Sequence, residues 1–577
     1  MNPKLSLQVA IALHQEGRLD EAKEAYFAIL EGDPACLDAL HRLGMLHVQQ
    51  NEYALATTQF EQILSYDPDD VVAHLHLGNC CLRLYKIDSN QASAKSLGKA
   101  RYHFEQAIRL KPDYVEAYNA LGNLFHQQDD LLKAMECYQK AVLLRPNYLD
   151  ALVNLGTISL KLERMDEAQH YFEQIVALYP SHDAANFQLG NIAYQRKQLD
   201  QALVFYEKIP YHLNAQLNMG SIFLEKGLTE KAIEKFIYVL SLEPKHLFAH
   251  SNLAALYVTQ KDFDKAISHY YEILSQDPDY YTAHFNLGAI YMQQRKWETA
   301  AYHLAIAIRL QVNDPDAHDN FATTLLKLNR IDLAKEHYQR ALALRPEDEI
   351  AAYRLAALTG TNQPEKAPGT YIQMLFDNYA DNFDHELMDS LQYKVPEAIH
   401  HLACRYLNEQ TELRIVDLGC GTGLAGRYFV TKAKQLIGVD LSSNMLKIAE
   451  KKHIYDNLIE EEMATALTAW KNEIDLIIAA DSFVYIGDMH ELLTNAHQAL
   501  RDGGYLIFTT ESGYQQDFQL TDTGRYLHHA DYLKRLATET GFEVLELIQV
   551  KLREQKGVPV NGYLVMFTNS SASILQE

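Results

Sequence analysis

Apolar and small residues recur at fixed offsets along the first 358 residues of the chain. An alanine is followed four positions later by an aromatic residue and twelve positions later by a proline, and this set repeats in steps of about 34 residues. Small residues at this spacing let two helices cross closely, the aromatic ring fills the space beside them, and proline ends the second helix. The pattern therefore predicts an α-solenoid of about ten helical hairpins over residues 1–358, closed by a capping helix at Glu349–Leu358. The alanines include Ala22, Ala56, Ala100, Ala134, Ala168, Ala232, Ala266 and Ala334.

The C-terminal part of the chain has a different rhythm, in which short apolar runs alternate with helical patterns. This alternation predicts a parallel sheet flanked by helices. Between the two patterns, residues 359–370 are rich in glycine, proline and polar side chains, which predicts a linker. We therefore expect a second domain over residues 371–577, beginning with a helical lid at Tyr371–Leu391. The predicted strands are Arg414–Leu418, Gln435–Val439, Ile474–Ala479 and Gly504–Thr509, followed by a hairpin of Glu543–Val550 and Gly562–Thr568.

Charge and cysteine content narrow the function classes. The formal net charge of -24 disfavours nucleic acid and anionic membrane surfaces as partners, because both are held by clusters of Lys and Arg. The N-terminus lacks a long apolar segment and no apolar run has the length of a membrane span, so we expect a cytoplasmic protein. The six cysteines have no zinc-ligand spacing, and no metal site is expected.

Candidate chemistry gathers after the first predicted strand. Asp417 is followed by three glycines at alternate positions and by a helical pattern from Leu424. Such glycines let the backbone approach a ligand where a Cβ would collide. Asp440 ends the second predicted strand, 19 residues after Gly421, which suits a ribose-binding acid. Taken alone, the pattern fits both a nicotinamide dinucleotide and S-adenosylmethionine.

The repeated set of small, aromatic and proline residues resembles the tetratricopeptide repeat. This resemblance implies a stacked array whose groove binds a protein or peptide partner. Five repeats carry asparagine at the same position, and this column resembles the asparagine ladder in the repeat domain of the O-linked N-acetylglucosamine transferases. Amides facing the groove could hold a peptide backbone, whereas the alternative is that asparagine is merely tolerated at an exposed helix position. The five are Asn154, Asn218, Asn252, Asn286 and Asn320.

The C-terminal domain resembles the class I S-adenosylmethionine-dependent methyltransferases. The string from Asp417 to Gly423 resembles their motif I, and Asp440 resembles the acid that ends their second strand. Leu476–Asp481 resembles their fourth strand, and Leu500–Leu506 resembles the turn into their fifth. The resemblance implies a Rossmann-like α/β domain with a seven-stranded, mostly parallel sheet, and S-adenosylmethionine as cofactor with S-adenosylhomocysteine as product. Four motifs in family order disfavour a dehydrogenase.

The same resemblance assigns roles to individual cofactor residues. Asp440 is expected to accept hydrogen bonds from both ribose hydroxyls, and Asp417 to orient the loop or reach the cofactor's ammonium through water. Glu462 falls where an acid accepts from the adenine amine, and Met463 where an apolar side chain covers the ring. The lid run around Tyr379 resembles a segment that lies over the cofactor. The complete set of expected cofactor residues is Asp417, Gly419, Gly421, Gly423, Asp440, Leu441, Glu462, Met463, Asp481 and Tyr379.

Catalytic residues are less well defined by the sequence. A methyl group on a sulfonium is already activated, so positioning and desolvation supply most of the catalysis, and a base is needed only for a protonated acceptor. The candidates near the expected mouth of the site are Tyr485, Tyr526, His528 and His529, with simple packing or exposure as the alternative for each.

Together the lid, the segment at 479–488 and the segment at 524–529 resemble bacterial predicted methyltransferases that carry tetratricopeptide repeats. We therefore predict a methyltransferase (EC 2.1.1.-) whose solenoid recruits a protein partner or protein substrate. One alternative is a small-molecule methyltransferase whose repeats are an assembly scaffold. Another is a repeat adaptor with a cofactor-sensing, catalytically weak domain. The pattern leaves the methyl acceptor, the partner and the oligomeric state open.

Overall fold

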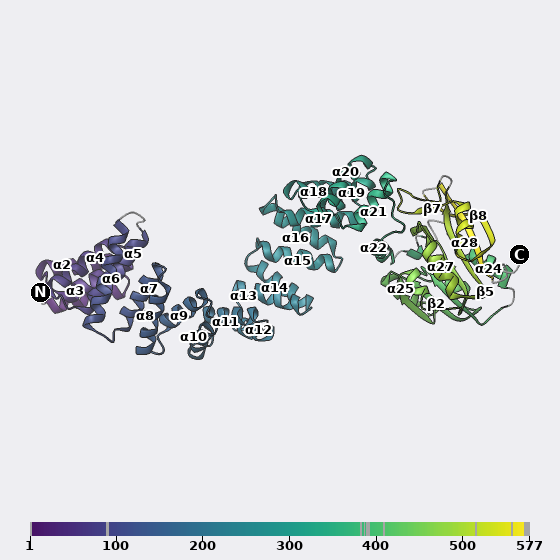
Figure 1. Cartoon of the computed structure of the whole chain (residues 1–577). Coiled ribbons are helices and arrows are strands. Elements are labelled where there is room, and N and C mark those ends of the chain that lie inside the picture. Colours follow the sequence, from purple (N-terminus) through teal and green to yellow (C-terminus); the bar gives the residue numbers. More distant parts are fainter. Residues whose placement is uncertain are drawn as a thin grey trace. The chain divides into compact units, whose positions relative to one another are not determined.

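The computed structural model describes residues 3–87, 92–380, 383–385, 387, 393–407, 410–513, 516–555 and 558–570. The chain divides into two compact units, Met1–Asp262 and Phe263–Glu577. The first unit is helical, and the second joins further helices to an α/β domain that holds all the strands (Figure 1). Among the described residues, no helix combines the length and the apolar character needed to cross a bilayer.

Helices α1 to α21 form the predicted solenoid, which is confirmed. Within the first unit α1 to α14 pack two by two as hairpins, and in the second unit α17 packs with α18 and α19 with α20. The bounds are α1 Pro3–Gln15, α2 Leu19–Gly32, α3 Leu37–Gln49, α4 Tyr53–Tyr66, α5 Val71–Ile87, α6 Ala92–Leu110, α7 Val115–Gln127, α8 Leu131–Leu144, α9 Leu149–Lys161, α10 Met165–Leu178, α11 Asp183–Gln195, α12 Leu199–Glu207, α13 Leu213–Glu225, α14 Thr229–Leu242, α15 Leu247–Thr259, α16 Phe263–Gln276, α17 Tyr281–Gln293, α18 Trp297–Leu310, α19 Pro315–Lys327, α20 Ile331–Leu344 and α21 Glu349–Thr359.

The repeated glycine marks a close approach of the two helices in the hairpins that carry it. A Cβ placed on Gly156 would lie 2.6 Å from the Phe172 ring, so the two helices cross where only hydrogen fits. Phe172 itself is 1% exposed. The same glycine-to-aromatic contact joins Gly44 to Phe60, Gly78 to Phe104, Gly122 to Tyr138, Gly190 to Tyr206 and Gly220 to Phe236.

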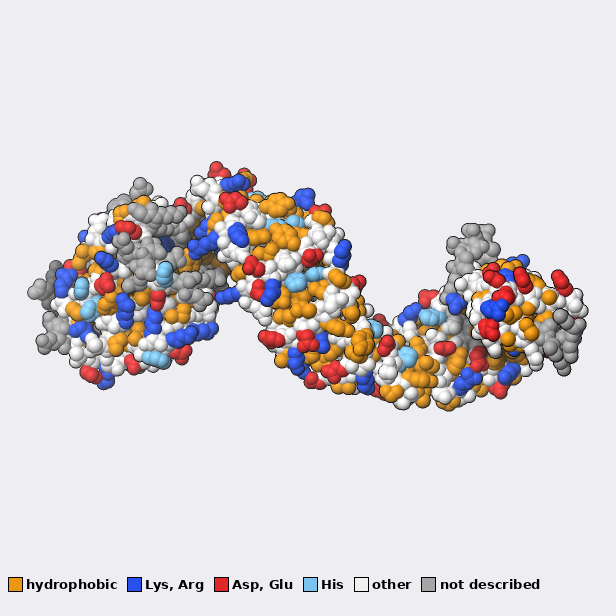
Figure 2. All heavy atoms as spheres, turned by 180° about the vertical axis from the view of Figure 1, so that it is seen from behind, with side chains coloured by type: hydrophobic (Ala, Val, Ile, Leu, Met, Phe, Trp, Pro, Cys, Tyr) orange, Lys and Arg blue, Asp and Glu red, His pale blue; other side chains and the backbone are white. Residues whose placement is uncertain are grey.

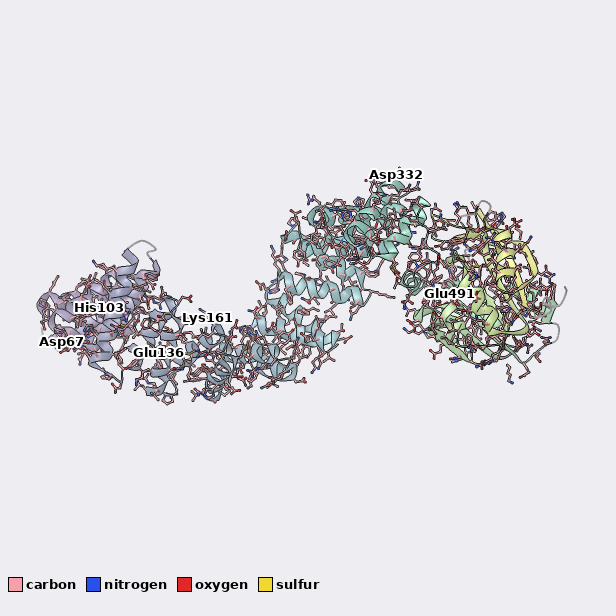
Figure 3. All side chains as sticks on the ribbon, viewed as in Figure 1. Asp67, His103, Glu136, Lys161, Asp332 and Glu491 are labelled. Atoms are coloured by element: carbon pink, nitrogen blue, oxygen red, sulfur yellow. The ribbon has the colours of Figure 1, made fainter. Side chains whose placement is uncertain are left out.

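Pairs of histidines form a second repeated contact, which the sequence reading missed. His74 Nε2 lies 3.1 Å from the Pro68 carbonyl oxygen, and its Nδ1 lies 2.9 Å from Nδ1 of His103 (Figure 3 labels His103). A neutral His74 that donates from Nε2 must accept at Nδ1, so His103 donates to it. Burial lowers the pKa of His103 to about 4, with a contribution from His74. The pair recurs as His284 with His303 and as His318 with His337.

The α/β domain contains a nine-stranded sheet in the order β3-β2-β1-β4-β5-β7-β6, with β9 paired to β5 and β8 to β9. Strands β1 to β5 run parallel to one another, whereas β9 is antiparallel to both β5 and β8. The path β3-β2-β1-β4-β5-β9-β8 is the expected seven-stranded, mostly parallel core, which confirms the predicted fold class. The bounds are β1 Leu413–Leu418, β2 Ala433–Asp440, β3 Asn457–Glu460, β4 Ile474–Ala479, β5 Leu500–Ser512, β6 Phe518–Leu520, β7 Tyr526–His528, β8 Glu543–Gln555 and β9 Val558–Asn569.

Helices cover both faces of this sheet. Buried side chains alternate along β1, where Val416 and Leu418 point to one apolar cluster and Ile415 points to another. The first cluster includes side chains of α26, α27 and α28, and the second includes side chains of α24. The helices of this domain are α22 Gly369–Tyr379, α23 Phe383–His385, α24 Val395–Leu407, α25 Ser443–Lys451, α26 Met463–Leu467, α27 His490–Ala499 and α28 Ala530–Glu539.

Two local predictions need correction or completion. The helix expected from Leu424 is wrong, because residues 421–425 form turns and Gly426–Tyr428 is a single 3₁₀ turn. Only 14 residues separate β1 from β2, and the first of them follow a tight glycine turn, which leaves too little chain for an α-helix. The expected lid helix forms as α22 and α23, and its residues 381–382, 386 and 388–391 lie outside the described part of the chain.

Candidate active site

The candidate site lies at the carboxyl ends of β1 and β4. These neighbouring parallel strands are where the strand order reverses, since β2 lies on one side of β1 and β4 on the other. In open α/β sheets this switch point is the usual place for a ligand. Ser482, just beyond β4, donates from Oγ to the Leu418 carbonyl at 2.9 Å and so ties the two strand ends together.

The three glycines after β1 form a tight turn. Gly419, Gly421 and Gly423 have φ angles of 67°, 53° and 90°, in the left-handed region that favours glycine. A Cβ on Gly419 would lie 2.4 Å from Ser482 Cβ, so this glycine is needed for packing. A Cβ on Gly421 would meet only the Phe383 ring, at 3.7 Å. Of the three, Gly421 is therefore the one with room for a ligand beside its backbone.

Asp440 holds this turn in place. Its Oδ2 accepts a hydrogen bond from the Gly421 N–H at 2.8 Å, and its Oδ1 accepts one from the Ser442 N–H at 2.8 Å. Burial raises the pKa of Asp440, while the backbone donors act in the opposite direction. Each carboxylate oxygen has a second lone pair, so Asp440 can accept further donors from a ligand.

Asp417, at the end of β1, is fully buried. Its Oδ2 accepts a hydrogen bond from the Tyr455 hydroxyl at 2.6 Å, and its Oδ1 is buried without a hydrogen-bond partner. Burial raises the pKa of Asp417 to about 7, and the nearby charge of Asp440 adds to the effect. A buried carboxylate oxygen that lacks a donor is costly, and a bound cation or N–H donor would satisfy it.

The adenine-side residues lie around the start of α26. Glu462 is the N-cap of this helix, and its Oε2 accepts from the Thr465 N–H at 3.0 Å. Its other oxygen lies 3.5 Å from Nζ of Lys366, which belongs to the linker. The Met463 sulfur lies 3.8 Å from where a Gly419 Cβ would be, so Met463 and the glycine turn are brought together.

The lid helix α22 is attached to the loop after β2. Asp377 Oδ1 accepts from the Ser442 hydroxyl at 2.5 Å and from the Asn444 N–H at 3.3 Å. Leu441 is half-buried and lies 3.9 Å from where a Cβ on Gly369, the first residue of α22, would be. Tyr379, at the end of α22, is 38% exposed, so its side chain is less enclosed than expected for a cofactor contact.

Aromatic side chains extend the lid over the site. The Phe376 ring lies 6.1 Å from the Phe383 ring and 5.6 Å from the Tyr485 ring, both edge to face. Thr422, in the glycine turn, donates from its hydroxyl to Asp384 of α23. The lid therefore contacts the glycine turn from one side and the end of β4 from the other.

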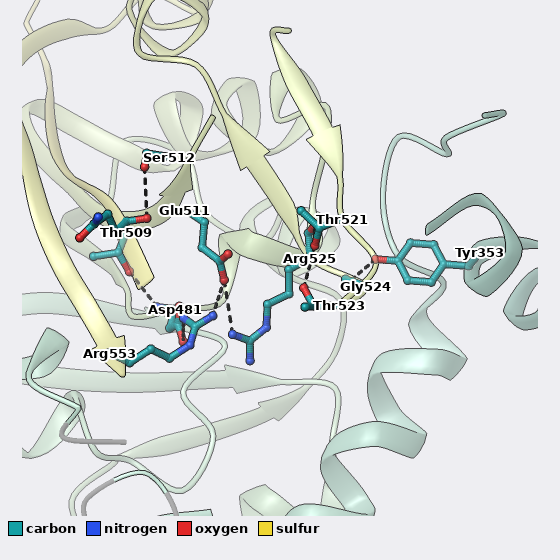
Figure 4. Close-up of polar contacts among 11 residues, drawn as sticks. Tyr353, Asp481, Thr509, Glu511, Ser512, Thr521, Thr523, Gly524, Arg525 and Arg553 are labelled. Carbon is teal, nitrogen blue, oxygen red and sulfur yellow. Dashed lines mark hydrogen bonds and ion pairs between the residues drawn. The ribbon is translucent and has the colours of Figure 1, made fainter. Parts of the chain in front are cut away.

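A buried cluster of charges lies beside Asp481 (Figure 4). Arg553, on β8, lies 2.9 Å from each carboxylate oxygen of Asp481 and also donates to Glu511 on β5. Arg525, just before β7, lies 3.4 Å from Glu511 and its guanidinium carbon lies 5.7 Å from the Tyr485 ring. Burial raises the pKa of Asp481 to about 6 and that of Glu511 to about 7, and Arg525 acts in the opposite direction on both.

Asp481 has a further unusual feature, a φ angle of 56°. Aspartate tolerates the left-handed region better than most residues, and residues held there are frequent at functional sites. Its backbone N–H donates to the Thr509 hydroxyl at 2.9 Å, which fixes the turn after β4. The turn directs the carboxylate towards Arg553.

Three of the predicted catalytic side chains are used for structural contacts. The Tyr526 hydroxyl donates to the Pro364 carbonyl at 2.6 Å. His528 is fully buried between the Thr510 hydroxyl and the Gly487 carbonyl, and burial lowers its pKa to about 4. His529 accepts from the Asp531 N–H at 3.2 Å and caps α28.

Tyr485, the fourth candidate, is the one placed against the charge cluster. It is 7% exposed and lies between Arg525 and the lid. Burial raises its pKa, with Arg525 acting in the opposite direction. A raised pKa keeps the phenol protonated at neutral pH, so it can donate a hydrogen bond, and little phenolate is present to act as a base.

The asparagine column of the repeats makes contacts inside the array. Asn154 donates from Nδ2 to Asn123 Oδ1 at 3.2 Å, and Asn218 donates to Asn191 Oδ1 at 3.0 Å. Asn252 donates to a carbonyl of its own helix, and the remaining two asparagines are half-buried. Binding of a peptide by these amides stays a prediction.

Sequence reasoning missed Arg553, Glu511 and Tyr455 as site residues. Arg553 lies 72 positions from Asp481 along the chain, so no local motif joins them. Arg553 is the one arginine of β8 and lies near the end of that strand, and its side chain is 3% exposed in the structure. An arginine just beyond the predicted strand Glu543–Val550 was the only indication of this role that the sequence offered. Arg525 belongs to the segment at 524–529 that resembles the methyltransferase family, but its contacts with Glu511 and Tyr485 could not be predicted from the sequence.

Comparison with family models agrees with both halves of the chain. Residues 387–547 match a model described as a methyltransferase domain. Models described as TPR or tetratricopeptide repeat match residues 41–89, 92–129, 113–181, 159–217, 217–280, 257–320 and 315–348.

Curated relatives match the C-terminal domain. A putative methyltransferase of Geobacillus sp. (strain WCH70) is 26% identical over 26% of this chain and 62% of its own length. The ubiquinone biosynthesis O-methyltransferase of Thiobacillus denitrificans is 24% identical over 27% of this chain and 77% of its own length. A malonyl-[acyl-carrier protein] O-methyltransferase of Hamiltonella defensa is 29% identical over 17% of this chain and 37% of its own length. The chain also matches a biotin biosynthesis bifunctional protein of Saccharophagus degradans and an O-methyltransferase of Pyrenophora dematioidea. It spans 25% of the length of the first, 64% of the length of the second and 62% of the length of the Geobacillus protein.

Solved structures similar to parts of this chain include YrrB and MamA. YrrB, described as a TPR protein with an unusual peptide-binding site, is 24% identical, with a TM-score of 0.28 over 33% of this chain and 95% of its own. The MamA protein is 23% identical, with a TM-score of 0.27 over 30% of this chain and 90% of its own. From the family models and the curated relatives, the chain is a tetratricopeptide-repeat protein that carries a C-terminal methyltransferase domain.

Proposed function

We propose that the protein is an S-adenosylmethionine-dependent methyltransferase whose repeats recruit a protein partner or protein substrate. The observation that carries the cofactor assignment is the buried, unpartnered Oδ1 of Asp417 beside the glycine turn. A sulfonium cofactor with an ammonium group offers both positive charge and N–H donors, which suits this acid. The residues present therefore fit the group.

Each part of the site has a definite task in this proposal. Asp440 holds the glycine turn and offers its remaining lone pairs to the ribose hydroxyls, while Asp417 faces the ammonium end. Met463 lies against the glycine turn at Gly419, and the Gly421 backbone has room beside it for the cofactor. When bound, S-adenosylmethionine supplies an activated methyl group for in-line displacement by a nucleophile of the acceptor.

The protein contributes positioning and exclusion of water. The lid aromatic Phe376 packs edge to face on the buried Tyr485 and so excludes water where the chain continues beyond β4. Arg525 and Asp481 lie next to Tyr485, where an acceptor approaching the end of β4 would meet them. Placement of two reactants in a dry pocket accounts for much of the rate enhancement of such displacements.

The repeat array supports recruitment of a partner. Tetratricopeptide arrays are stacked hairpins that present extended surfaces, and such surfaces bind peptides and proteins. On the described part of the face drawn in Figure 2, acidic and basic side chains are interspersed with apolar ones. We therefore expect a protein partner in preference to a polyanion, in agreement with the net charge of -24.

The small-molecule alternative has its own supporting observation. Two of the curated relatives named above are O-methyltransferases of ubiquinone biosynthesis and of an acyl-carrier protein's malonyl group, as their names state. If the acceptor is of that kind, the repeats serve assembly with a partner enzyme. The experiment below separates the two.

The first test measures binding of S-adenosylhomocysteine to the full chain by calorimetry. Asp440→Asn keeps one acceptor for the glycine turn but removes the negative charge, so we expect affinity to fall about 100-fold, equivalent to ~2.7 kcal/mol for charge-assisted bonds. Asp456→Asn is the matched control, because Asp456 also accepts from a backbone N–H, that of Leu436 at 2.8 Å. Unchanged affinity in Asp440→Asn would contradict the assignment.

The second test follows methyl label from S-adenosylmethionine into a cell lysate. We expect label in a discrete protein band with the full chain and none with Asp440→Asn. A double variant, Asn252→Ala with Asn320→Ala, keeps the catalytic domain and alters the asparagine column, so loss of the band with intact cofactor binding supports recruitment by the groove. Label confined to the small-molecule fraction would favour the scaffold alternative.

A further inference from the structure

The last helix of the repeat array reaches the charge cluster of the candidate site. Tyr353, on α21, is 1% exposed, and its hydroxyl donates to the Gly524 carbonyl at 2.9 Å (Figure 4). Its ring lies 5.0 Å from the Tyr371 ring and 6.4 Å from the Tyr526 ring. Tyr353 therefore belongs to the repeats by sequence and to the core of the catalytic unit by its contacts.

The linker that follows α21 is bound along its length. The Gln363 side-chain oxygen accepts from the Leu520 N–H at 2.8 Å, and the Glu365 carbonyl accepts from the Gly487 N–H at 2.7 Å. Ala367 N–H donates to the Tyr485 carbonyl at 2.9 Å. The linker thus connects the β6–β7 hairpin with the turn after β4.

The turn that receives the Tyr353 hydrogen bond carries Arg525 and is closed by two backbone hydrogen bonds. Its backbone closes through Thr521 N–H to the Arg525 carbonyl at 2.9 Å and Gly524 N–H to the Thr521 carbonyl at 3.0 Å. Gly524 has a φ angle of 73°, and a Cβ there would lie 2.9 Å from the Tyr371 hydroxyl. Because Arg525 is the next residue, a displacement of this carbonyl moves the backbone that carries its side chain.

The two arginines of the cluster are not equivalent. Arg553 is 3% exposed and is shared between Asp481 and Glu511, which use both of its terminal nitrogens. Arg525 has a 26% exposed side chain, and its one described ion pair is the 3.4 Å contact with Glu511. Arg525 is therefore the arginine whose position depends most on the turn that carries it.

Helix α21 is in turn fixed to the preceding repeat. Arg354 donates to Asp319 of α19 at 2.7 Å and to the Thr323 hydroxyl at 3.2 Å, and both charged side chains are largely buried. Asp319 precedes Asn320, a member of the asparagine column. Helix α21 thus has one charged contact on the array and one polar contact on the site.

From these contacts we propose that Tyr353 is a positioning residue, through which the repeat array sets the place of Arg525 beside Asp481, Glu511 and Tyr485. The proposal rests on the proposed function only for its consequence on methyl transfer. Its structural part, the dependence of Arg525 on Tyr353, holds for the protein without any ligand.

The test uses the full chain and a readout that does not need the cofactor. Arg525 holds down the pKa of Glu511, which burial raises to about 7. Removal of the hydroxyl in Tyr353→Phe keeps the ring but frees the Gly524 carbonyl, so Arg525 moves away from Glu511 and the pKa of Glu511 rises. We expect a rise of about half a unit or more, measured by carbon NMR of side-chain-labelled glutamate, with Glu511→Gln to assign the signal.

A double-mutant cycle distinguishes positioning from a general loss of packing. Arg525→Gln should raise the pKa of Glu511 further, and Tyr353→Phe with Arg525→Gln should equal Arg525→Gln alone, because Tyr353 then has nothing to position. Additive shifts, or an unchanged pKa in Tyr353→Phe, would overturn the proposal. Arg525→Lys, which keeps the charge, gives an intermediate shift and serves if Arg525→Gln does not fold.

A matched tyrosine of the first unit supplies the control. Tyr138 is also fully buried and donates from its hydroxyl to Asn123 at 2.7 Å, so Tyr138→Phe loses the same chemical group away from the catalytic unit. It should leave the pKa of Glu511 unchanged. Binding of S-adenosylhomocysteine to the same proteins is measured by calorimetry as an independent experiment. If the wild-type chain does not bind it, the proposed function is contradicted, whereas the effect of Tyr353 on the pKa of Glu511 is unaffected.

If methyl transfer is found, it gives a second readout. We expect Tyr353→Phe to reduce label incorporation about five-fold, the effect of losing one hydrogen bond of about 1 kcal/mol, with cofactor affinity unchanged. An equal loss in Tyr138→Phe would contradict a specific role for Tyr353.

Discussion

The repeat array and the α/β domain both bury polar side chains, but they bury opposite kinds. The array buries histidines in pairs, such as His284 with His303, whose Nδ1 atoms lie 3.0 Å apart. The α/β domain buries carboxyl groups, of which Asp417 is fully buried and Glu511 is 6% exposed. Burial disfavours the charged form of either group, so it lowers the pKa of His303 and raises the pKa values of Asp417 and Glu511.

The difference follows from the architecture of each region. In the array a hydrogen bond from histidine to a carbonyl six residues earlier occurs in several repeats, so each pair is a local solution repeated along the chain. In the α/β domain the acids come together from β1, β4 and β5 at one edge of the sheet. The repeated histidine contacts stabilise a scaffold. The acids carried by distant strands instead form a site in which a polar atom, Oδ1 of Asp417, has no hydrogen-bond partner.

The largest expected effect tests whether the two regions are separable. Helix α21 contributes Tyr353, Ala356 and Ala357 to an apolar cluster with Val484 and Tyr485 of the catalytic domain. A fragment of residues 360–577 should therefore be less stable than one of residues 348–577 by more than about 4 kcal/mol, since loss of one large buried ring alone costs about 3–5 kcal/mol. Chemical unfolding followed at Trp470 measures the difference.

A longer fragment is the control for this experiment. Residues 331–577 add α20, which lies outside the cluster, and should unfold at Trp470 with the same midpoint as residues 348–577. Equal stability of the 360–577 and 348–577 fragments would show that the catalytic domain ends at the linker.

The next effect is a pH dependence of opposite sign in the two regions. In the α/β domain the folded state keeps a proton on Asp417 up to about pH 7, whereas the unfolded state loses it near its ordinary pKa of 3.8. The folded state binds more protons, so stability falls as pH rises from about 4 to about 7. In the array the folded pKa of His303 is about 4 against 6.5, so stability falls as pH drops from about 6.5 to about 4.

Two tryptophans allow the regions to be read separately. Trp297 begins α18, the helix of His303, and Trp470 lies in the core of the α/β domain. With Trp470→Phe the remaining fluorescence reports the array, and with Trp297→Phe it reports the catalytic domain. Between pH 5 and pH 7.5 we expect changes of opposite sign of about 2–2.5 kcal/mol, because the folded and unfolded states differ by most of one proton over much of this range and each pH unit is then equivalent to about 1.4 kcal/mol. Asp417→Asn should reduce the pH dependence of the stability of the catalytic domain. If the stability of both regions changed with pH in the same direction, the predicted difference between them would be wrong.

The smallest effect concerns the repeated glycine contact. Gly156→Ala places a methyl 2.6 Å from the Phe172 ring, and we expect a loss of about 1 kcal/mol after the gain in helix propensity is offset. Gly98→Ala, in a helix with no atom within 4 Å of the new methyl, should instead stabilise by about 0.5–1 kcal/mol. Thermal unfolding of the two variants followed by far-ultraviolet circular dichroism checks the sign of each change, and a stabilising Gly156→Ala would show that the hairpin is loosely packed.

More of the repeat array than of the candidate site could be predicted from the sequence, because contacts in the array are local and contacts in the site join distant segments. Alanine, glycine and aromatic positions of the array could be predicted because each contact lies within one repeat. The strands were predicted as buried apolar runs, and β4 has the predicted bounds Ile474–Ala479. The fold class followed from these two patterns.

Contacts between distant segments could not be predicted in this way. Arg553 meets Asp481 only when β8 has paired with β9 and β9 has paired with β5. The hydrogen bond of Tyr353 joins residues that are 171 positions apart in the sequence. The helix expected after the glycine turn is wrong although both flanking strands were predicted, because the glycine turn and the 3₁₀ turn at Gly426–Tyr428 take up the chain between them. Such features depend on the assembled sheet.

The contacts of α21 and the linker also bear on how this pair of domains could be inherited. An exchange of repeat arrays by recombination at the linker would separate Tyr353 from Gly524 and remove part of the apolar cluster that both halves share. A crossover before Asp348, the N-cap of α21, would carry the helix and linker along with the enzyme. The heritable module is therefore expected to be the methyltransferase together with the final repeat helix, and descendants with new arrays should retain a tyrosine and a glycine at these two positions.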